Sequence, residues 1–441
     1  TEYSFELSTR EIVEKKLNEQ LAGRSWKMPP AIMGGAIRKF DTMCRNTVPA
    51  SCLKVAARYG GKAAGLGFLA HQDVVGEGST VQQKLGYRLT PLGFAVPISY
   101  YLEFVEFNSQ RDPVFAANLA KLIESEVGSR AKLSSPELRT LVRNVQDGFL
   151  HAHFPPGMYA RLQRSIHKLK RRYAKTFPRQ TLKKLKFRSS ANVEDIPSFN
   201  GAGLHDSYSA VLSKSDAESA DAPCVRVSQK TRYRVKESLS PKSVACAIKA
   251  AYGSLWNLRA VRERSFRRFD HRGAYMGLAV VPSYKHPKNS SQGKIEANSV
   301  LFTRVLNAPT VYGYQLSTQE KNGLVTNPKP GTLSELTTLL FQLRSVPAPS
   351  VLQFARPRVG EEKRTTPILS TKTMREIVAV ARTIEEAYCE AKPSYFVVNG
   401  KKRKCHQVSN SQEKPAALDM ELKTYSNGEI LFKQVREFHG R

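Results

Sequence analysis

An α/β protein of two or three packed domains is what the sequence predicts, on three observations. The chain has 441 residues, more than one ordinary hydrophobic core supports. Hydrophobic residues make up 41% and charged residues 24%, the balance of a globular rather than a disordered protein. Segments with the 3.6-residue period of helices also alternate with short apolar runs that are typical of strands.

The first 180 residues are predicted to be mainly helical. Residues 1–50 contain paired prolines and paired glycines, which indicates an extension before the main domain. Small side chains at residues 63–70 predict a helix directly after Gly60-Gly61. Residues 93–98 predict a buried strand that leads into a helix, and residues 114–180 carry amphipathic helical patterns.

Strands and helices are mixed in the remainder. Strands are predicted at residues 186–190, 276–282, 299–303 and 312–316, helices at 243–269, 332–343 and 373–391, and a hairpin at 417–434. Residues 213–236 and 285–296 are polar and mixed in composition, so we expect loops or insertions there.

Two of these segments carry residues suited to phosphate binding. Gly60-Gly61-Lys62 precedes a helix, where glycines let backbone N–H groups approach a phosphate and the lysine adds positive charge. Arg188 leaves a strand into a loop rich in serine and glycine, where its planar fork can clamp a phosphate. The alternatives are an ordinary glycine turn and a loop held by a structural Arg–Asp pair.

The predicted carboxyl-terminal hairpin carries a third polar group. Strand alternation places Asp419 and Glu421 on one face of its first strand, and Gln434 and Arg436 on one face of its second. A carboxylate that faces an amide and an arginine suits Mg²⁺ and phosphate binding. Alternating polar residues on an exposed hairpin face are the alternative.

Together these segments resemble the amino-terminal ATP-grasp domain of phosphoenolpyruvate synthase and pyruvate phosphate dikinase. That family has a G-G-K-x-x-x-L helix start, a G-F-[AV]-[VI]-P strand, an R-S-S-x-x-E-D-x-P loop and a terminal L-x-x-E…Q-x-R hairpin. The same order appears here over roughly residues 52–440, and residues 251–260 are similar to the family's S-L-W…R-A helix.

The resemblance implies an ATP-grasp fold with two subdomains around a nucleotide cleft. We expect an amino-terminal extension at residues 1–50, a first part at 51–275 and a second part at 276–441. It also implies ATP and Mg²⁺ as cofactors. Lys62 and Arg188 would contact the ATP phosphates, Glu421 would bind Mg²⁺, Gln434 would support it, and Arg436 would hold the transferred phosphate.

Two departures from the family pattern bear on activity. Where relatives have Q-x-G-E-[DN]-L-V, this chain has Lys321 for the glycine and Asn322 for the glutamate, although a one-residue slip would let Glu320 substitute. The 441 residues also contain no T-x-H-A segment and leave no room for a pyruvate-handling barrel of about 250 residues. The sequence therefore favours a weak or inactive nucleotide-binding module over an active phosphotransferase that works with a separate phosphohistidine protein.

The net charge of +31, from 69 Lys and Arg against 38 Asp and Glu, indicates a polyanionic partner. We expect RNA within a ribonucleoprotein assembly, such as an organellar ribosome or its assembly machinery, together with other proteins of that assembly. A solvated basic surface is the alternative. Candidate nucleic-acid contacts lie in two basic stretches: Arg164, Lys168, Arg171, Arg172, Arg264, Arg267 and Arg268. A mitochondrial location is favoured over a cytoplasmic one, and no apolar run is long enough to span a membrane.

The six cysteines are scattered, and none forms a C-x-x-C pair. In a chain of this length we expect free thiols in a reducing compartment rather than a disulfide framework. Cys405-His406 lies in a basic turn that lacks nearby partners for a zinc site.

Overall fold

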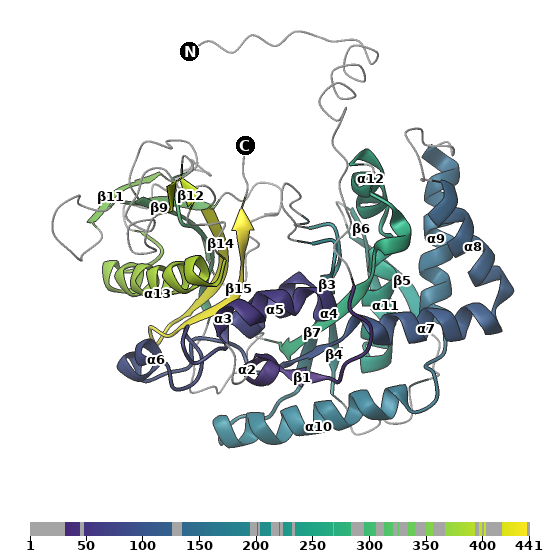
Figure 1. The fold of residues 1–441 in the computed structure, drawn as a ribbon, viewed down its shortest axis with the longest axis horizontal. Helices are drawn as coiled ribbons and strands as arrows, with labels where there is room; N and C mark the ends of the chain where they lie inside the picture. Colours follow the sequence, from purple (N-terminus) through teal and green to yellow (C-terminus); the bar gives the residue numbers. More distant parts are fainter. Residues whose placement is uncertain are drawn as a thin grey trace, which may run out of the picture.

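Two antiparallel sheets joined through a short helix form the framework of the protein (Figure 1). This computed structural model describes residues 31–44, 48–125, 135–194, 201, 203–212, 220, 224–231, 234–267, 269–283, 295–305, 313–320, 325, 334–340, 350–355, 367–392, 397–398, 401–402 and 417–438.

The first sheet has five strands in the order β1-β2-β7-β3-β4. They are β1 (Arg38–Lys39), β2 (Phe94–Val96), β3 (Lys184–Ala191), β4 (Tyr208–Val211) and β7 (Met276–Pro282). Every residue of the central strand β7 is buried, because both faces of the sheet are covered. Leu278 and Val280 join the large helical core on one face, whereas Ala279 and Val281 join the smaller core on the other.

Helices supply the large core beside this sheet. They are α7 (Ile98–Arg111), α8 (Pro113–Ser125), α9 (Ser135–His151), α10 (Met158–Thr176), α11 (Val244–Gly253) and α12 (Leu258–Phe266). In α10 the residues Leu162, Ile166, Leu169 and Tyr173 recur at helical spacing and are buried. Its opposite face is basic and exposed, and the helix runs along the lower edge of the molecule in Figure 1.

The second sheet has six strands in the order β11-β10-β9-β8-β14-β15. They are β8 (Ile295–Phe302), β9 (Gly313–Glu320), β10 (Glu335–Leu340), β11 (Ser350–Ala355), β14 (Ala417–Tyr425) and β15 (Ile430–Phe438). Helix α13 (Thr371–Ala391) shares a core with this sheet and is capped by Ser370, whose side chain accepts a hydrogen bond from the Thr373 backbone amide. The Tyr314 hydroxyl donates to the Glu385 carboxylate at 2.5 Å, which ties β9 to α13.

Short elements complete the fold. They are α2 (Phe40–Met43), α3 (Pro49–Lys54), α4 (Ala56–Tyr59), α5 (Gly61–Leu69), α6 (Thr80–Leu85), the 3-10 turns η1 (Ser254–Trp256) and η2 (His271–Gly273), and the hairpins β5 (Val225–Thr231) with β6 (Arg234–Ser240) and β12 (Val397–Val398) with β13 (Lys401–Lys402). Helix α5 contacts β3 of the first sheet and β15 of the second, so it lies between the two sheets.

Three of the predicted elements are wrong. Residues 335–340 form strand β10 instead of a helix, because alternate side chains are buried and the backbone pairs with β9. Residues 225–231 form a strand within a predicted loop. The predicted helix 243–269 is interrupted at Asn257, whose backbone is extended and whose amide donates to Leu204 O and to Asp206.

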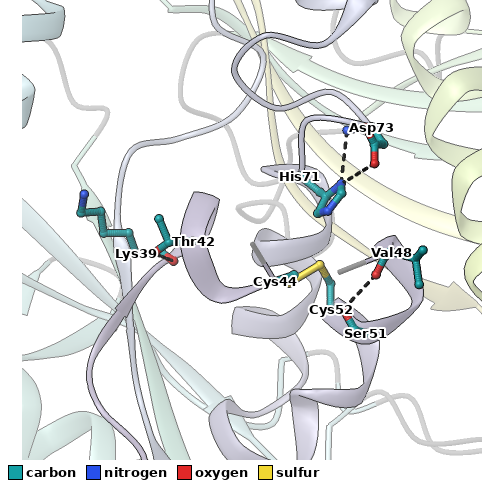
Figure 2. The surroundings of a disulfide bond; sticks show 8 residues. All are labelled: Lys39, Thr42, Cys44, Val48, Ser51, Cys52, His71 and Asp73. Atoms are coloured by element: carbon teal, nitrogen blue, oxygen red, sulfur yellow. Dashed lines mark hydrogen bonds and ion pairs between the residues drawn. A yellow bond between two sulfur atoms is a disulfide. The ribbon is translucent and has the colours of Figure 1, made fainter. Parts of the chain in front are cut away.

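The prediction of free thiols is also wrong. Cys44 is bonded to Cys52 and Cys224 to Cys246, and Cys389 is disulfide-bonded as well. The first bridge connects α2 to α3 (Figure 2). No spacing motif marks these pairs in the sequence. The two cysteines of each pair become neighbours only in the folded chain.

Within the described residues, no helix combines the length and the apolar character that crossing a membrane requires.

Removing the Cys224–Cys246 bridge should destabilise the protein. The bridge joins residues 22 apart, and a loop of that size corresponds to roughly 3 kcal/mol of lost chain entropy in the unfolded state. We expect urea unfolding of the Cys224→Ser/Cys246→Ser variant to show a loss of that order. Thiol titration of the denatured, unreduced protein is the control; thiols that titrate at these positions would contradict the pairing.

Candidate functional site

The start of helix α5 is fixed against the end of strand β3. Gly60 has φ +80°, and a Cβ at this position would lie 1.7 Å from the Ser190 carbonyl oxygen, so only glycine fits. The Ser190 hydroxyl donates to Tyr59 O at 2.8 Å and accepts from the Ala63 amide at 2.9 Å. The two predicted phosphate segments are therefore joined directly.

Lys62 projects from the first turn of α5 toward the loop that follows β3. Its Nζ donates to Glu194 Oε1 at 2.6 Å and to the Ser189 hydroxyl at 3.4 Å. The Lys62 side chain is 12% exposed and that of Glu194 2%, so this ion pair is largely shielded from water. Such a pair is costly to break by removing one partner, because a buried charge would be left behind.

The terminal hairpin reaches the other side of α5. A Cβ at Gly65 would lie 2.6 Å from Val435 O, which shows how closely α5 packs against β15. In the β14–β15 ladder Asp419 pairs in register with Arg436, and Glu421 with Gln434. The four polar side chains that the sequence placed on two strand faces are thus cross-strand neighbours.

Arg188 connects the two sheets. From β3 its guanidinium donates to Lys433 O at 2.7 Å and to Gln434 Oε1 at 2.6 Å, both on β15. It also donates to Glu421 Oε2 on β14 at 3.3 Å. We call the set formed by Lys62, Arg188, Glu194, Asp419, Glu421, Lys433, Gln434 and Arg436 the inter-sheet cluster.

Positive charge around Glu421 controls its protonation. Burial would raise the pKa of this carboxyl, but Lys433, Arg188, Arg436 and Lys62 outweigh burial and lower the pKa to about 2. Two of these cations, Arg188 and Lys433, lie 3.3 and 3.8 Å from the Glu421 carboxylate. Burial in turn lowers the pKa of Lys433, and the Arg188 charge adds to that effect.

Arg436 is held more tightly than Arg188. Its Nε and Nη2 donate to Asp419 Oδ2 at 2.9 and 2.6 Å, and both side chains are almost fully buried. By contrast, Glu421 is 27% exposed and its oxygen lies 3.3 Å from Arg188 and 3.8 Å from Lys433. Glu421 is therefore the carboxylate that can most easily exchange its partners.

The cluster has the chemistry of an anion site that is internally neutralised. Four cations from three chain segments face the carboxylates of Glu194, Asp419 and Glu421. In the described part of the chain no three His, Cys, Asp or Glu side chains are grouped to hold a metal ion. Mg²⁺ commonly takes only one or two protein carboxylates and completes its shell with water and phosphate oxygens, which Glu421 alone would suit.

All five residues predicted at the nucleotide site are brought together: Lys62, Arg188, Glu421, Gln434 and Arg436. Their roles toward a ligand stay predictions. Sequence reasoning assigned no role to Glu194 or Lys433. Both lie inside motifs already recognised, one in the loop after Arg188 and the other next to Gln434, so a charge-partner search within those motifs would have found them.

The predicted nucleic-acid contacts divide into different environments. Arg164, Lys168 and Arg171 are exposed on α10, whereas Arg172 binds Asp41 at 2.6 Å. Arg267 pairs with Glu263 on its own helix. Arg268 lies outside the described residues, as do Lys321 and Asn322.

The prediction for Arg264 is wrong. Its side chain is fully buried, lies over the Trp256 ring and donates to His271 Nδ1 and Leu255 O, each at 2.9 Å. A side chain in this position cannot reach a nucleic acid. In Figure 1, α12, which carries Arg264, lies near the upper edge of the molecule, whereas α10 runs along the lower edge.

Comparison with known families gives one finding. The family model described as "Pyruvate phosphate dikinase, AMP/ATP-binding domain" matches residues 56–304, more than half of the chain. The matched span includes Lys62 and Arg188 and ends before the β14–β15 hairpin. Comparison with curated proteins returned no match.

Glu421 should make the protein acid-sensitive. Its pKa is about 2 in the folded state against an ordinary value of 4.5, so it contributes stability above pH 4.5 that is lost as the pH falls toward 2. The shift corresponds to on the order of 3 kcal/mol. We expect Glu421→Gln to unfold at lower urea than the parent at pH 7 and to approach it near pH 2.

Glu429→Gln at the other end of the same hairpin is the matched control. Burial raises the pKa of Glu429, so its removal should not lower stability at pH 7. If Glu421→Gln and the parent differed equally at pH 7 and pH 2, the assignment of a depressed pKa to Glu421 would be incorrect.

Proposed function

The chain belongs to the AMP/ATP-binding domain family of pyruvate phosphate dikinase, and from this premise we propose that the inter-sheet cluster binds the phosphates of ATP. The observation that carries the proposal is the meeting of Lys62 of α5, Arg188 of β3, and Lys433 and Arg436 of β15 in the inter-sheet cluster, where each forms an ion pair with a carboxylate. Separate segments that bring four cations to one place, beside a helix start, suit a polyphosphate.

ATP would bind by replacing one of the hydrogen-bond acceptors of Arg188 with a phosphate oxygen. The Arg188–Glu421 contact of 3.3 Å is the longest of the three that Arg188 makes, so it is the one that a phosphate oxygen replaces most easily. Phosphate and the Glu421 carboxylate would then repel each other. A Mg²⁺ ion held by Glu421, with Gln434 beside it, would supply the charge that lets both remain.

We propose further that phosphotransfer is weak or absent. The support is in the sequence, where Asn322 and Lys321 replace the expected glutamate and glycine. Phosphoryl transfer depends on metal charge and on positioning, and an amide does not supply the charge of a carboxylate. The alternative is an active dikinase-type phosphotransferase that uses a separate phosphohistidine protein, which the complete set of Lys62, Arg188, Glu421 and Arg436 would favour.

A second function, binding of RNA, is proposed for the exposed face of α10. Arg164, Lys168 and Arg171 recur at spacings of three and four residues, so they lie along one side of the helix. The net charge of +31 on the whole chain favours association with a polyanion. Contacts to phosphates rather than base edges would make this binding largely independent of sequence.

The cellular location of the protein stays a proposal. A ribonucleoprotein assembly in an organelle such as the mitochondrion agrees with the charge. Within this proposal, the disulfides support a compartment that keeps cysteines oxidised, because disulfides persist there.

Glu421→Gln should change how ATP binding depends on metal. Without Mg²⁺ the variant should bind ATP more tightly than the parent, because Arg188 no longer has a competing carboxylate. Adding Mg²⁺ should then improve its affinity less. Calorimetry with and without Mg²⁺ measures both effects, and Arg188→Gln, expected to lose about 10- to 100-fold in affinity, is the opposite control. Equal metal dependence in parent and Glu421→Gln would exclude Glu421 as the metal ligand.

ATP consumption by the purified protein should be far below that of ordinary kinases. The measurement is release of AMP, ADP and phosphate with and without pyruvate. Turnover of roughly 1–100 per second would contradict a weak or inactive module and support the phosphotransferase alternative. A measurable affinity for ATP in the same preparation shows that low turnover does not result from misfolding.

RNA affinity should fall steeply with salt. For 6–10 phosphate contacts the loss is about 10³- to 10⁵-fold between 50 and 200 mM salt. Filter binding of unrelated RNAs across a salt series tests this, with the Arg164→Glu/Lys168→Glu/Arg171→Glu variant as comparison. Negligible affinity at low salt, or affinity that survives this charge reversal, would leave a solvated basic surface as the better explanation.

A further inference from the structure

A small hollow lies between strand β1 and helix α10, separate from the inter-sheet cluster. Its volume is about 220 Å³. Ser165, Lys168, Leu169 and Arg172 line it from one face of α10, at the spacing of successive helical turns. Arg38 and Lys39 of β1 form the facing wall. The floor is apolar and includes the buried ring of Phe94.

The charge of this hollow is one-sided. Four cations line it, and no Asp or Glu is among the described residues that do. Arg172 is offset by Asp41 at 2.6 Å and Glu77 at 3.4 Å, both outside the lining. Within the described part of the chain, Lys39 and Lys168 form no ion pair with a carboxylate, whereas the Arg38 side chain interacts with the Tyr59 hydroxyl. Like charges that converge without a counterion repel one another, and a bound anion removes that repulsion.

The size of the hollow limits what it can enclose. Pockets that bury a whole small-molecule ligand have volumes of about 300–1,000 Å³. A hollow of about 220 Å³ instead accommodates one anionic group of a larger ligand. Exposed cations continue from it along α10, at Arg164 and Arg171, so further anionic groups would find partners on the same side of the helix.

We propose that this hollow is a phosphate-anchoring site, which takes one phosphodiester group of an RNA backbone that follows α10. The inference rests on the proposed RNA binding and adds to it a defined point of attachment. Lys168 and Lys39 contact the phosphate, and Arg172 is fixed beside them. The apolar floor offers no hydrogen bond to a base edge, so the site reads charge and shape rather than sequence.

The surrounding structure holds the hollow open. Asp41 of α2 orients Arg172 through two hydrogen bonds, at 2.9 and 2.6 Å. The Thr42 hydroxyl donates to Lys39 O, and the Cys44–Cys52 bridge fastens the end of α2 to α3 (Figure 2). Binding groups that are already ordered lose less entropy when the ligand arrives, which favours a specific anchor over a diffuse basic surface.

Two pairs of variants test the anchor by fluorescence anisotropy with a labelled oligoribonucleotide of mixed sequence. Lys168→Glu is compared with Lys175→Glu, the same charge reversal at an exposed position of α10 outside the hollow. Ser165→Phe, which fills the hollow without changing charge, is compared with Ser165→Ala. Thermal unfolding verifies that each variant is folded.

We expect Lys168→Glu and Ser165→Phe each to lower affinity about tenfold or more, and Lys168→Glu to reduce the salt slope by about 1. Lys175→Glu and Ser165→Ala should lose much less. Equal losses for the two lysine variants, with Ser165→Phe unchanged, would overturn the anchor and leave general RNA binding standing. No RNA binding by the parent protein would overturn both proposals. Binding to phosphatidylglycerol vesicles but not to RNA, with loss in the same variants, would overturn the RNA assignment by showing that the hollow takes a lipid phosphate.

Discussion

The contact of Arg188 with the β14–β15 hairpin is the interaction on which the arrangement of the two sheets depends. Arg188 belongs to β3 of the first sheet, and its three hydrogen-bond acceptors belong to the second. Helix α5 fills the remaining space, with Gly60 against Ser190 on one side and Gly65 against Val435 on the other. The hydrogen bonds of the guanidinium and the close approaches at the two glycines fix how the sheets meet. The same contacts place the charged side chains of both sheets around Glu421.

This arrangement explains why the motif residues could be predicted and their partners could not. Three motifs can be recognised from local sequence alone: the glycine before Lys62, the serines after Arg188 and the alternation in the hairpin. The ion pair of Lys62 with Glu194 joins residues 132 positions apart and depends on how α5 meets the loop after β3. Local patterns contain no information about such a meeting. The disulfides were missed for the same reason, since Cys224 and Cys246 become neighbours only when β5 packs beside α11.

Arg264 and Arg164 show a different limit of sequence reasoning. Both lie in basic helical stretches and look alike in a sequence, yet one is fully buried and the other is exposed. Arg264 is accommodated because Trp256 provides a ring for its flat guanidinium and His271 and Leu255 accept its hydrogen bonds. Burial lowers its pKa to about 10, which leaves it charged at neutral pH. The net charge of the chain therefore overstates the positive charge at its surface. The exposed cations of α10 make up a larger fraction of the surface charge than of the net charge.

The position of the β14–β15 hairpin has a consequence for how the protein folds during translation. Strand β8 pairs with β14, whose residues follow more than a hundred positions later, and α5 rests on β15, which is made later still. Contacts between such distant residues form slowly, because a long intervening segment must first be closed into a loop. A ribosome-bound chain that has reached only residue 304 has Lys62 and Arg188 but lacks the hairpin that completes their surroundings. The inter-sheet cluster is thus assembled at a late step of synthesis, when the second sheet closes.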